Sequence, residues 1–591
     1  MLVAHILQPI SLFLALLLTL GLYLLWRDRL THLFLEDKGR PPLLLDRCPW
    51  VSVVGLVIVC SNALLVITQS ENISSRPVWV LLCTSVPSIV VFIQILLKVY
   101  RYEAGEFSLL MQVIVASMTI ILSTVIVFPF DGADTWAHLA NADLLQDQGS
   151  FNVIEAGYKN YPLFPALVNF LRIISGVDPS RAARIITLLF SVVCLMLLYS
   201  LVSEYYGSVQ RGLISILILL GSKWFIYWST LVVSMSAAML LFTAFYVLLT
   251  KRLFLTNDGR TGSVLTILYI LVAIISPFLH PVGSIAIILL CIGYFLTAAL
   301  FTLNGNKGAY SNLIVISLFV VVVTITQWIF YGQTFVLAMR SLIAAIFEDT
   351  AYSVRLAAST SEPLTYFVDN MNFYLLLCFS LVELLRQIRI RKDPLVLLTG
   401  ITGMIFVGFA FSMQITNLQA VLPYRWLLFG SILLVIPAAN ILASMMRTTR
   451  IRWKLLLTAG FSIFVFFGYI TKDINRDHPL YSIRSAQLYQ ITYPEYSGLQ
   501  FAKRGLLDLH TLVQVDYRLW DYLKYQTDSA YLGYWDEYLL QERNMIFADR
   551  DVYRVHRDAF LGDSVENLDL SRPGLNQIYD NGELRWLEWV P

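Results

Sequence analysis

Long apolar segments separated by short polar loops make up the chain as far as residue 470. Their lengths suit the crossing of a bilayer, and we place about fourteen of them. They lie near 3–26, 48–69, 77–97, 107–128, 182–202, 211–229, 231–250, 263–276, 282–303, 309–331, 371–388, 394–415, 425–446 and 454–470. The pattern therefore predicts a polytopic α-helical membrane protein, in which 211–229 and 231–250 can also be one broken unit.

Three larger polar regions interrupt or follow these spans, at 130–181, 332–370 and 471–591. Within the first, 158–176 is amphipathic and punctuated by prolines, which favours a segment lying in the membrane interface. The last contains predicted strands at 512–515 and 545–557 and a predicted helix at 516–525. Its closing segment, 576–589, is predicted to form two strands around an Asn-Gly turn. We expect residues 1–470 to form the membrane domain and 471–591 a small C-terminal α/β or α+β domain.

Lysine and arginine in short loops orient the chain, because such loops stay in the cytoplasm. With fourteen spans, every basic loop falls on one side, which we take as cytoplasmic. The basic residues are Arg27, Arg29, Lys38, Arg40, Arg47, Lys98, Arg101, Lys251, Arg252, Arg260, Lys307, Arg386, Arg389, Arg391, Lys392, Arg447, Arg450, Arg452 and Lys454. We therefore expect a multi-pass plasma-membrane protein whose large loops and C-terminal domain are all extracytoplasmic.

Composition agrees with this class, since 57% of the 591 residues are hydrophobic, only 14% are charged and the mean hydropathy is +0.68. A net charge of +2 gives no indication of a nucleic-acid partner. The chain has no GxxxxGK[ST], GxGxxG, HExxH or GxSxG motif, which argues against an ATP-driven pump, a dinucleotide enzyme, a zinc peptidase and a serine hydrolase. The spans are nearly free of ionisable residues apart from Glu383, which argues against a transporter.

The residues best suited to catalysis cluster in the acid-rich stretch 129–165, directly after an apolar run. If a helix covers 131–148, Asp131, Asp134 and His138 fall at i, i+3 and i+7 on one face. A carboxylate one turn from an imidazole, roughly 6 Å along the axis, suits proton or metal chemistry at a lipid–water boundary. The plainer alternative is a solvated loop helix whose acids stabilise its N-terminus.

Other residues end up at the same predicted face of the membrane. Lys223, Trp224, Tyr227 and Trp228 lie at the end of one span, His280 in a short turn, and Tyr424 and Arg425 at the start of another. Singly, each fits an interfacial aromatic belt or a snorkelling cation. Together, cations and a histidine near a carboxylate cluster indicate an anionic ligand such as a lipid phosphate or pyrophosphate.

The GADTWAHL sequence at 132–139, followed by Gly149 and YKNYPL at 158–163, resembles the first outer loop of the GT-C superfamily of membrane glycosyltransferases. That superfamily includes dolichyl-phosphate-mannose and aminoarabinose transferases and the oligosaccharyltransferase catalytic subunit. The His280-Pro281 turn, the Tyr424-Arg425 span start and a C-terminal outer domain match its architecture more weakly. The resemblance implies transfer of a sugar from a polyprenyl- or dolichyl-phosphate donor to a lipid-linked glycan, lipid or protein acceptor.

By this resemblance, Asp134 is the general base or a metal contact, and Asp131 and His138 are its partners. Lys223, His280, Tyr424, Arg425 and Lys159 are then the candidates for binding the substrate or the lipid phosphate. The resemblance is compatible with transfer with or without a divalent metal. If Mg or Mn binds, Asp134 is its expected ligand.

Alternatives remain at this level. One is metal-dependent transfer like that of oligosaccharyltransferases, although residues 534–537 read YWDE and lack their WWDxG motif, which argues against a peptide acceptor. A flippase or transporter of a lipid-linked glycan, with the acidic loop as a gate, is a second. A non-catalytic scaffold whose tail binds a partner is a third.

Overall fold

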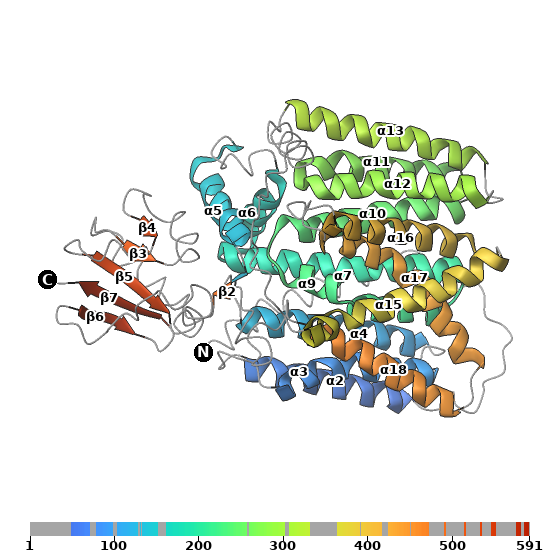
Figure 1. Cartoon of the computed structure of the whole chain (residues 1–591), viewed down its shortest axis with the longest axis horizontal. Coiled ribbons are helices and arrows are strands. Elements are labelled where there is room, and N and C mark those ends of the chain that lie inside the picture. Colours follow the sequence, from blue (N-terminus) through green and yellow to red (C-terminus); the bar gives the residue numbers. More distant parts are fainter. Residues whose placement is uncertain are drawn as a thin grey trace.

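The computed structural model describes most of the helical part of the chain and the strands of the tail. The described residues are 49–70, 78–98, 103–127, 130–131, 133–151, 161–256, 259–301, 307–330, 363–390, 392–415, 424–448 and 451–471, with 490–491, 513–515, 532–534, 545–550, 575–580 and 584–589. Long helices lie side by side as a bundle, with the strands of the tail beyond one end of it (Figure 1). The predicted span at 3–26, residue Lys159 and the predicted helix at 516–525 lie outside the described residues.

Each of the other predicted spans coincides with a helix or with a bent pair of helices. They are α2 (Pro49–Ser70), α3 (Val78–Leu96), α4 (Glu103–Val127), α7 (Pro179–Tyr206), α8 (Val209–Leu220) with α9 (Lys223–Thr230), α10 (Ser234–Phe254), α11 (Gly259–Leu279), α12 (Pro281–Phe301), α13 (Lys307–Phe330), α15 (Pro363–Ile390), α16 (Pro394–Ile415), α17 (Tyr424–Thr448) and α18 (Ile451–Tyr469). Seven helices of the described part are long and apolar enough to cross a membrane, or eight with the bent pair. The helical membrane class is thus confirmed, and the number of fourteen spans stays a prediction.

The ends of α7 show how the sequence sets a span boundary. The Asp178 side chain accepts a hydrogen bond from the backbone N–H of Arg181 at 3.0 Å, and Pro179 follows at the first helical position. Gly207 ends the helix with φ of 56°, a left-handed conformation that favours glycine. An N-cap acid, an N1 proline and a C-terminal glycine are local signals, and they explain why the boundaries of this span could be predicted.

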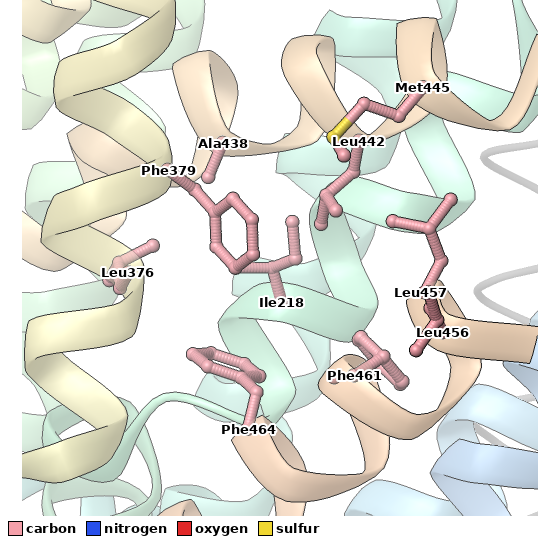
Figure 2. A pocket seen from close by; sticks show the side chains of 11 residues that line it. Ile218, Leu376, Phe379, Ala438, Leu442, Met445, Leu456, Leu457, Phe461 and Phe464 are labelled. Atoms are coloured by element: carbon pink, nitrogen blue, oxygen red, sulfur yellow. The ribbon is translucent and has the colours of Figure 1, made fainter. Parts of the chain in front are cut away.

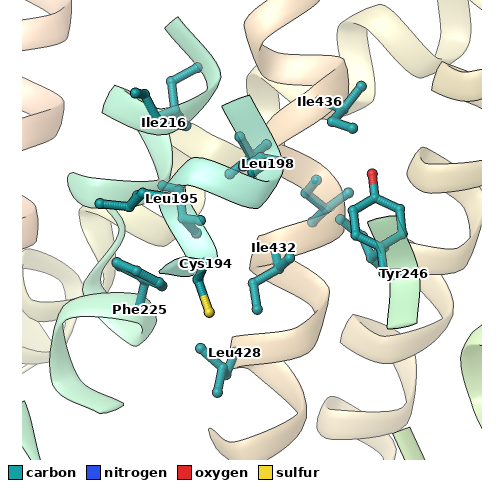
Figure 3. Packing of buried hydrophobic residues seen from close by; sticks show 14 of the residues in the cluster. Cys194, Leu195, Leu198, Ile216, Phe225, Tyr246, Leu428, Ile432 and Ile436 are labelled. Atoms are coloured by element: carbon teal, nitrogen blue, oxygen red, sulfur yellow. The ribbon is translucent and has the colours of Figure 1, made fainter. Parts of the chain in front are cut away.

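Helix α17 forms the centre of the bundle, where it packs against α8, α15 and α16. In its apolar window 89% of the residues are buried, compared with 33% in the peripheral α11. Figure 3 shows Leu428, Ile432 and Ile436 of α17 among side chains of α7, α8 and α10. A helix that is apolar on every face needs protein on every face, which places α17 inside and leaves α11 against lipid.

The two ends of the bundle differ in chemistry. At one end, α7 and α10 are joined by a 2.6 Å ion pair between Glu204 and Lys251, and Tyr206 donates a 2.8 Å hydrogen bond to Asp393 before α16. Arg386, Arg389 and Lys454 belong to the same end, where α15 finishes and α18 begins. We call it the basic end. The opposite end is called the α5 end after the helix α5 (Ala133–Gln148) that follows α4 there.

The predicted broken unit is a bent pair of helices, formed by α8 and α9 rather than by 211–229 with 231–250. The two helices meet at 65° around Gly221 and Ser222. Asn372 of α15, fully buried, donates to the carbonyls of Gly221 at 2.8 Å and Phe464 at 2.6 Å and accepts from the backbone N–H of Lys223 at 3.0 Å. These bonds satisfy the backbone groups freed by the bend, which is required wherever water is absent.

Glu383, the acid predicted inside a span, lies fully buried in α15. Its Oε1 atom accepts hydrogen bonds from Arg386 at 2.7 Å, Gln387 at 2.9 Å and Asn440 at 2.6 Å. An acid inside a membrane bundle is costly unless it is paired, and these bonds supply the pairing. Glu383 therefore joins α15 to α17 near the basic end.

The strands of the tail form a mixed five-stranded sheet in the order β4-β3-β5-β7-β6. The strands are β3 (Val513–Val515), β4 (Leu532–Tyr534), β5 (Met545–Arg550), β6 (Leu575–Asp580) and β7 (Leu584–Trp589). β3 is parallel to β4 and β5, whereas β5, β7 and β6 are antiparallel. The predicted strands at 512–515 and 576–589 coincide with β3 and with the paired β6 and β7, whereas only 545–550 of the predicted strand at 545–557 is described, as β5. The C-terminal domain and its boundary at 471 stay predictions.

Two glycines are in contact where α18 passes the break in the bent pair. A Cβ added at Gly468 would lie 2.0 Å from the carbonyl oxygen of Gly221, which is part of the backbone and cannot move aside. We predict that Gly468→Ala lowers the free energy of unfolding by about 1–3 kcal/mol or more, because the helices must separate. Thermal unfolding of the purified protein in detergent measures this.

Gly460→Ala in the same helix is the matched control, since a Cβ there meets nothing within 4 Å. It should leave the unfolding temperature unchanged or raise it, because alanine favours helix by roughly 1 kcal/mol over glycine. Equal effects of the two substitutions would contradict the close approach of Gly468 and Gly221.

Candidate functional site

Helix α5 begins at Ala133, so Asp134 and His138 are one helical turn apart, as predicted. The prediction of a helix from Asp131 is wrong. Asp131 belongs to the short strand β1 (Phe130–Asp131), where it pairs with Gln490 of β2 (Gln490–Ile491). A backbone partner from the tail holds Asp131 extended, so it does not share a helix face with the other two residues. The same pairing brings the tail to the α5 end.

His138 carries its imidazole into the bundle, where it is 1% exposed. Its Nε2 atom accepts a hydrogen bond from the backbone N–H of Ser234, the first residue of α10, at 3.3 Å. Phe164 meets the ring edge-on, with ring centroids 4.8 Å apart. Because Nε2 accepts, the neutral ring carries its proton on Nδ1.

His280 occupies the short turn between α11 and α12 and is also buried. Its Nδ1 atom accepts from the backbone N–H of Val282 at 3.1 Å, so the neutral ring carries its proton on Nε2. Burial holds the pKa of His280 well below its usual range, and the charge of Arg425 and the neighbouring His138 lower it further. The fold thus brings together two imidazoles and a guanidinium that the sequence separates by almost three hundred positions.

Arg425, the second residue of α17, provides the permanent charge of this group. Its guanidinium carbon lies 6.0 Å from the ring centroid of Trp228, at the far end of α9. Within the described residues, its Nε atom is buried and makes no hydrogen bond. A buried guanidinium donor beside two neutral imidazoles is suited to an anion with several oxygen atoms.

Lys223, another predicted phosphate contact, begins α9 and is 2% exposed. Its ammonium pairs with Asp369 of α15 at 2.5 Å and lies 4.8 Å from the ring centroid of Trp224. Asp369 balances its charge, so Lys223 ties α9 to α15. The aromatic rings of Trp224, Tyr227 and Trp228 make edge-on contacts along α9 between this ion pair and Arg425.

The amphipathic region after α5 contains helix α6 (Leu163–Ser175). Phe164 and Val168 pack inward, whereas Phe170, Ile173 and Ile174 are more than 60% exposed. Arg172 forms an ion pair with Asp143 that fastens α6 to α5. An apolar face left exposed beside the end of a membrane bundle agrees with the predicted interfacial segment.

The structure does not test every predicted residue. It describes the backbone of Asp131, Asp134 and Tyr424 but not their side chains, and Lys159 lies outside the described residues. Among the side chains that it describes, no group of three His, Cys, Asp or Glu residues could hold a metal ion. His138, four residues after Asp134 in α5, already uses Nε2 to accept a hydrogen bond from Ser234. The Mg or Mn ion that the loop motif leaves open therefore stays a prediction resting on Asp134.

The sequence predicted no role for three residues of this region: Ser234, Asn372, and Asp369, which was expected only as part of the polar region 332–370 and lies in α15 instead. Ser234 acts through its backbone N–H, which no side-chain motif could reveal. Asp369 and Asn372 lie in the first three turns of α15, and the polar sequence DNMN at 369–372 was the available signal. Only the packing of α15 against α9 gives these residues partners.

Solved structures similar to this chain include ArnT from Cupriavidus metallidurans bound to undecaprenyl phosphate, at 11% identity and a TM-score of 0.48. That match covers 80% of this chain and 97% of ArnT. The oligosaccharyltransferase of Archaeoglobus fulgidus, solved with Zn and sulfate, matches at 12% identity and a TM-score of 0.43, over 69% of this chain and 60% of its own.

No protein-family model matches the chain, and no curated protein matches it. At this level of identity and structural overlap, the function has to be argued from the residues of the chain itself.

The lowered pKa of His280 predicts how stability depends on pH. Above about pH 6.5 the ring is neutral in both folded and unfolded chains, so His280 does not lower the free energy of unfolding. As the pH falls below that value, His280 becomes protonated in the unfolded chain but stays neutral in the folded chain, where its pKa is lower. Proton binding then stabilises the unfolded state, and the free energy of unfolding decreases. The unfolding temperature, measured from about pH 8 to 5, should fall at the acidic end.

His280→Asn is the matched variant, because the amide oxygen can accept from Val282 N–H without titrating. Its unfolding temperature should decline less between pH 7 and pH 5 than that of the wild type. Identical pH profiles would contradict the assignment of this dependence to His280.

Proposed function

We propose that this chain is a membrane glycosyltransferase that transfers a sugar from a polyprenyl-phosphate donor at the α5 end of the bundle. The observation that carries the proposal is the convergence of His138, His280 and Arg425 beside the helix that bears Asp134. An arginine whose Nε atom is buried, together with imidazole N–H donors, matches the phosphate of a lipid carrier, and a carboxylate beside them matches a base. The acceptor is a lipid-linked glycan, a lipid or a protein.

The proposed reaction assigns one task to each group. Asp134 accepts the proton of the acceptor hydroxyl as its oxygen attacks the anomeric carbon. The bond from that carbon to the phosphate oxygen breaks, and polyprenyl phosphate leaves with the electron pair. Arg425 and the Nε2–H of His280 stabilise the charge that develops on the phosphate. Attack opposite the leaving group inverts the anomeric configuration.

His138 has a positioning task in this scheme rather than a chemical one. Its bond to Ser234 holds α5 against the first turn of α10 and thereby fixes the backbone that carries Asp134. Lys223 has a similar task, because its ion pair with Asp369 fixes the start of α9, and Trp228 at the end of that helix lies against Arg425. Both residues would locate the reactive groups without contacting the reacting atoms.

The lipid carrier fits the surroundings of the site. α6 exposes apolar side chains beside it, and the bundle around it is built of apolar helices. A donor carried on a lipid reaches such a site along the membrane and needs no nucleotide-binding motif, and none occurs in the sequence.

The base assignment is tested with Asp134→Asn. We expect loss of transfer of a radiolabelled sugar from polyprenyl-phosphate donors in membranes, by about 100-fold or more, with the protein still folded, since general base catalysis contributes about 10²–10⁴. Asp147→Asn, an exposed acid of the same helix, is the control and should keep wild-type activity. Transfer by Asp134→Asn at the wild-type rate would refute the assignment.

The same assay with a chelator separates two mechanisms. Activity that survives chelation means a metal-free base, whereas activity lost on chelation and restored by Mg or Mn means metal-assisted transfer like that of oligosaccharyltransferases. Transport of the lipid-linked glycan without transfer would favour the flippase alternative.

The phosphate assignment is tested with Arg425→Gln. Removing a charge-assisted hydrogen bond worth about 1.5–3 kcal/mol should reduce kcat/KM for the donor by roughly 10- to 100-fold. Arg181→Gln, half-exposed and paired with Asp178 at the start of α7, is the control and should change little. An unchanged kcat/KM in Arg425→Gln would place the phosphate elsewhere.

A further inference from the structure

An apolar cavity of about 220 Å³ lies between α8, α15, α17 and α18, away from the residues of the proposed reaction. Figure 2 shows Phe379, Phe461 and Phe464 around it, with Ile218 at its back and Leu442 above. Every residue of its wall is apolar. An apolar cavity of about 150 Å³ already stays dry and binds hydrocarbon, so this one excludes polar ligands and suits a hydrocarbon chain.

Gly460 provides part of this space. A Cβ at Gly460 would meet nothing within 4 Å, in contrast to Gly468 of the same helix. Glycine inside a helix costs about 1 kcal/mol relative to alanine. Gly460 is neither in close contact with a neighbouring helix nor in a left-handed conformation, so neither explains why glycine is present. What the missing side chain leaves is open volume in the cavity wall.

The cavity opens toward lipid on the side of α18 that lies near the basic end. Leu456 belongs to its wall and is 60% exposed, whereas Leu457 next to it is 8% exposed. Leu455, at 66% exposed, continues the apolar surface outward. In a membrane such a surface meets acyl chains, so a chain can enter sideways without crossing water.

Basic residues are frequent in the sequence on either side of this opening. Lys454 lies two residues before Leu456 on α18, and the sequence from 440 to 460 also contains Arg447, Arg450 and Arg452 without a single Asp or Glu. α15, which forms the opposite wall, has Arg389 in its last turn at the same end of the bundle, whereas the charge of Arg386 is paired with Glu383. Basic residues beside an apolar groove between membrane helices match the phosphate of an anionic lipid.

We propose that this cavity binds one hydrocarbon chain of an anionic phospholipid from the leaflet at the basic end, with the lipid phosphate beside Lys454. The inference is independent of the proposed glycosyltransfer, whose phosphate site lies at the α5 end. The bound chain fills the gap between α17, the centre of the bundle, and α18, so the lipid acts as part of the packing there.

Native mass spectrometry of the purified full-length protein tests this with two probes that share their acyl chains, dioleoyl phosphatidylglycerol and dioleoyl phosphatidylcholine. We expect the wild type to bind one phosphatidylglycerol about fivefold or more tightly than phosphatidylcholine, since one lysine near a lipid phosphate contributes about 1 kcal/mol. Lys454→Gln should lose this preference while its affinity for phosphatidylcholine stays unchanged. Gly460→Leu should weaken both lipids about tenfold.

Gly408→Leu is the matched control, because Gly408 of α16 also has open space around its Cβ position but lies outside the cavity; it should bind like the wild type. If Gly460→Leu proves unstable, Ala438→Leu fills the cavity from α17. Wild-type lipid binding in both filled variants would overturn the proposal. So would displacement of phosphatidylglycerol by one equivalent of polyprenyl phosphate, which would assign the cavity to the donor chain, or occupancy by detergent alone.

Discussion

The hydrogen bonds of Asn372 are the interaction on which the α5 end depends. A membrane helix that bends by 65° frees backbone N–H and C=O groups, and hydrocarbon offers them no partner. Asn372 supplies both a donor and an acceptor at the bend and reaches a third element, α18, through the carbonyl of Phe464. The bend starts α9 in a new direction, and α9 carries Lys223 at one end and Trp228 at the other. Without a paired bend, Trp228 would not lie against Arg425.

Electrostatics then decides how the site holds its charges. Two imidazoles near a guanidinium would repel one another if all three were protonated, and burial would raise that cost. Each imidazole instead accepts a backbone N–H, from Ser234 or Val282, which favours the neutral ring. Arg425 remains as the single permanent cation of the trio. The arrangement has one net positive charge and ring N–H donors, a combination that an anion of several oxygens satisfies.

Glycine has two opposite uses in α18. Gly468 lets the helix approach Gly221 so closely that no side chain fits, which locks α18 to the bent pair. Gly460, two turns earlier, leaves a space that no neighbouring side chain fills. The helix is therefore tightly packed near the α5 end and loosely packed near the basic end. Such a difference agrees with the two proposals, in which reactive groups are held in place at one end of the bundle and a lipid chain completes the packing near the other.

The sequence by itself determined the class of the protein and most of its helices, because a span must be apolar over a fixed length and is marked by local caps such as Asp178 and Gly207. It also placed Asp134 and His138 one turn apart, since helical period is a local property. The start of α5 was predicted too early because Asp131 takes its strand partner, Gln490, from a distant part of the chain. Tertiary structure alone decided that His138, His280 and Arg425 meet, that Lys223 is neutralised by Asp369, and that a cavity lies beside Gly460. These depend on which helices pack together, and uniformly apolar helices give no periodic signal that specifies their neighbours.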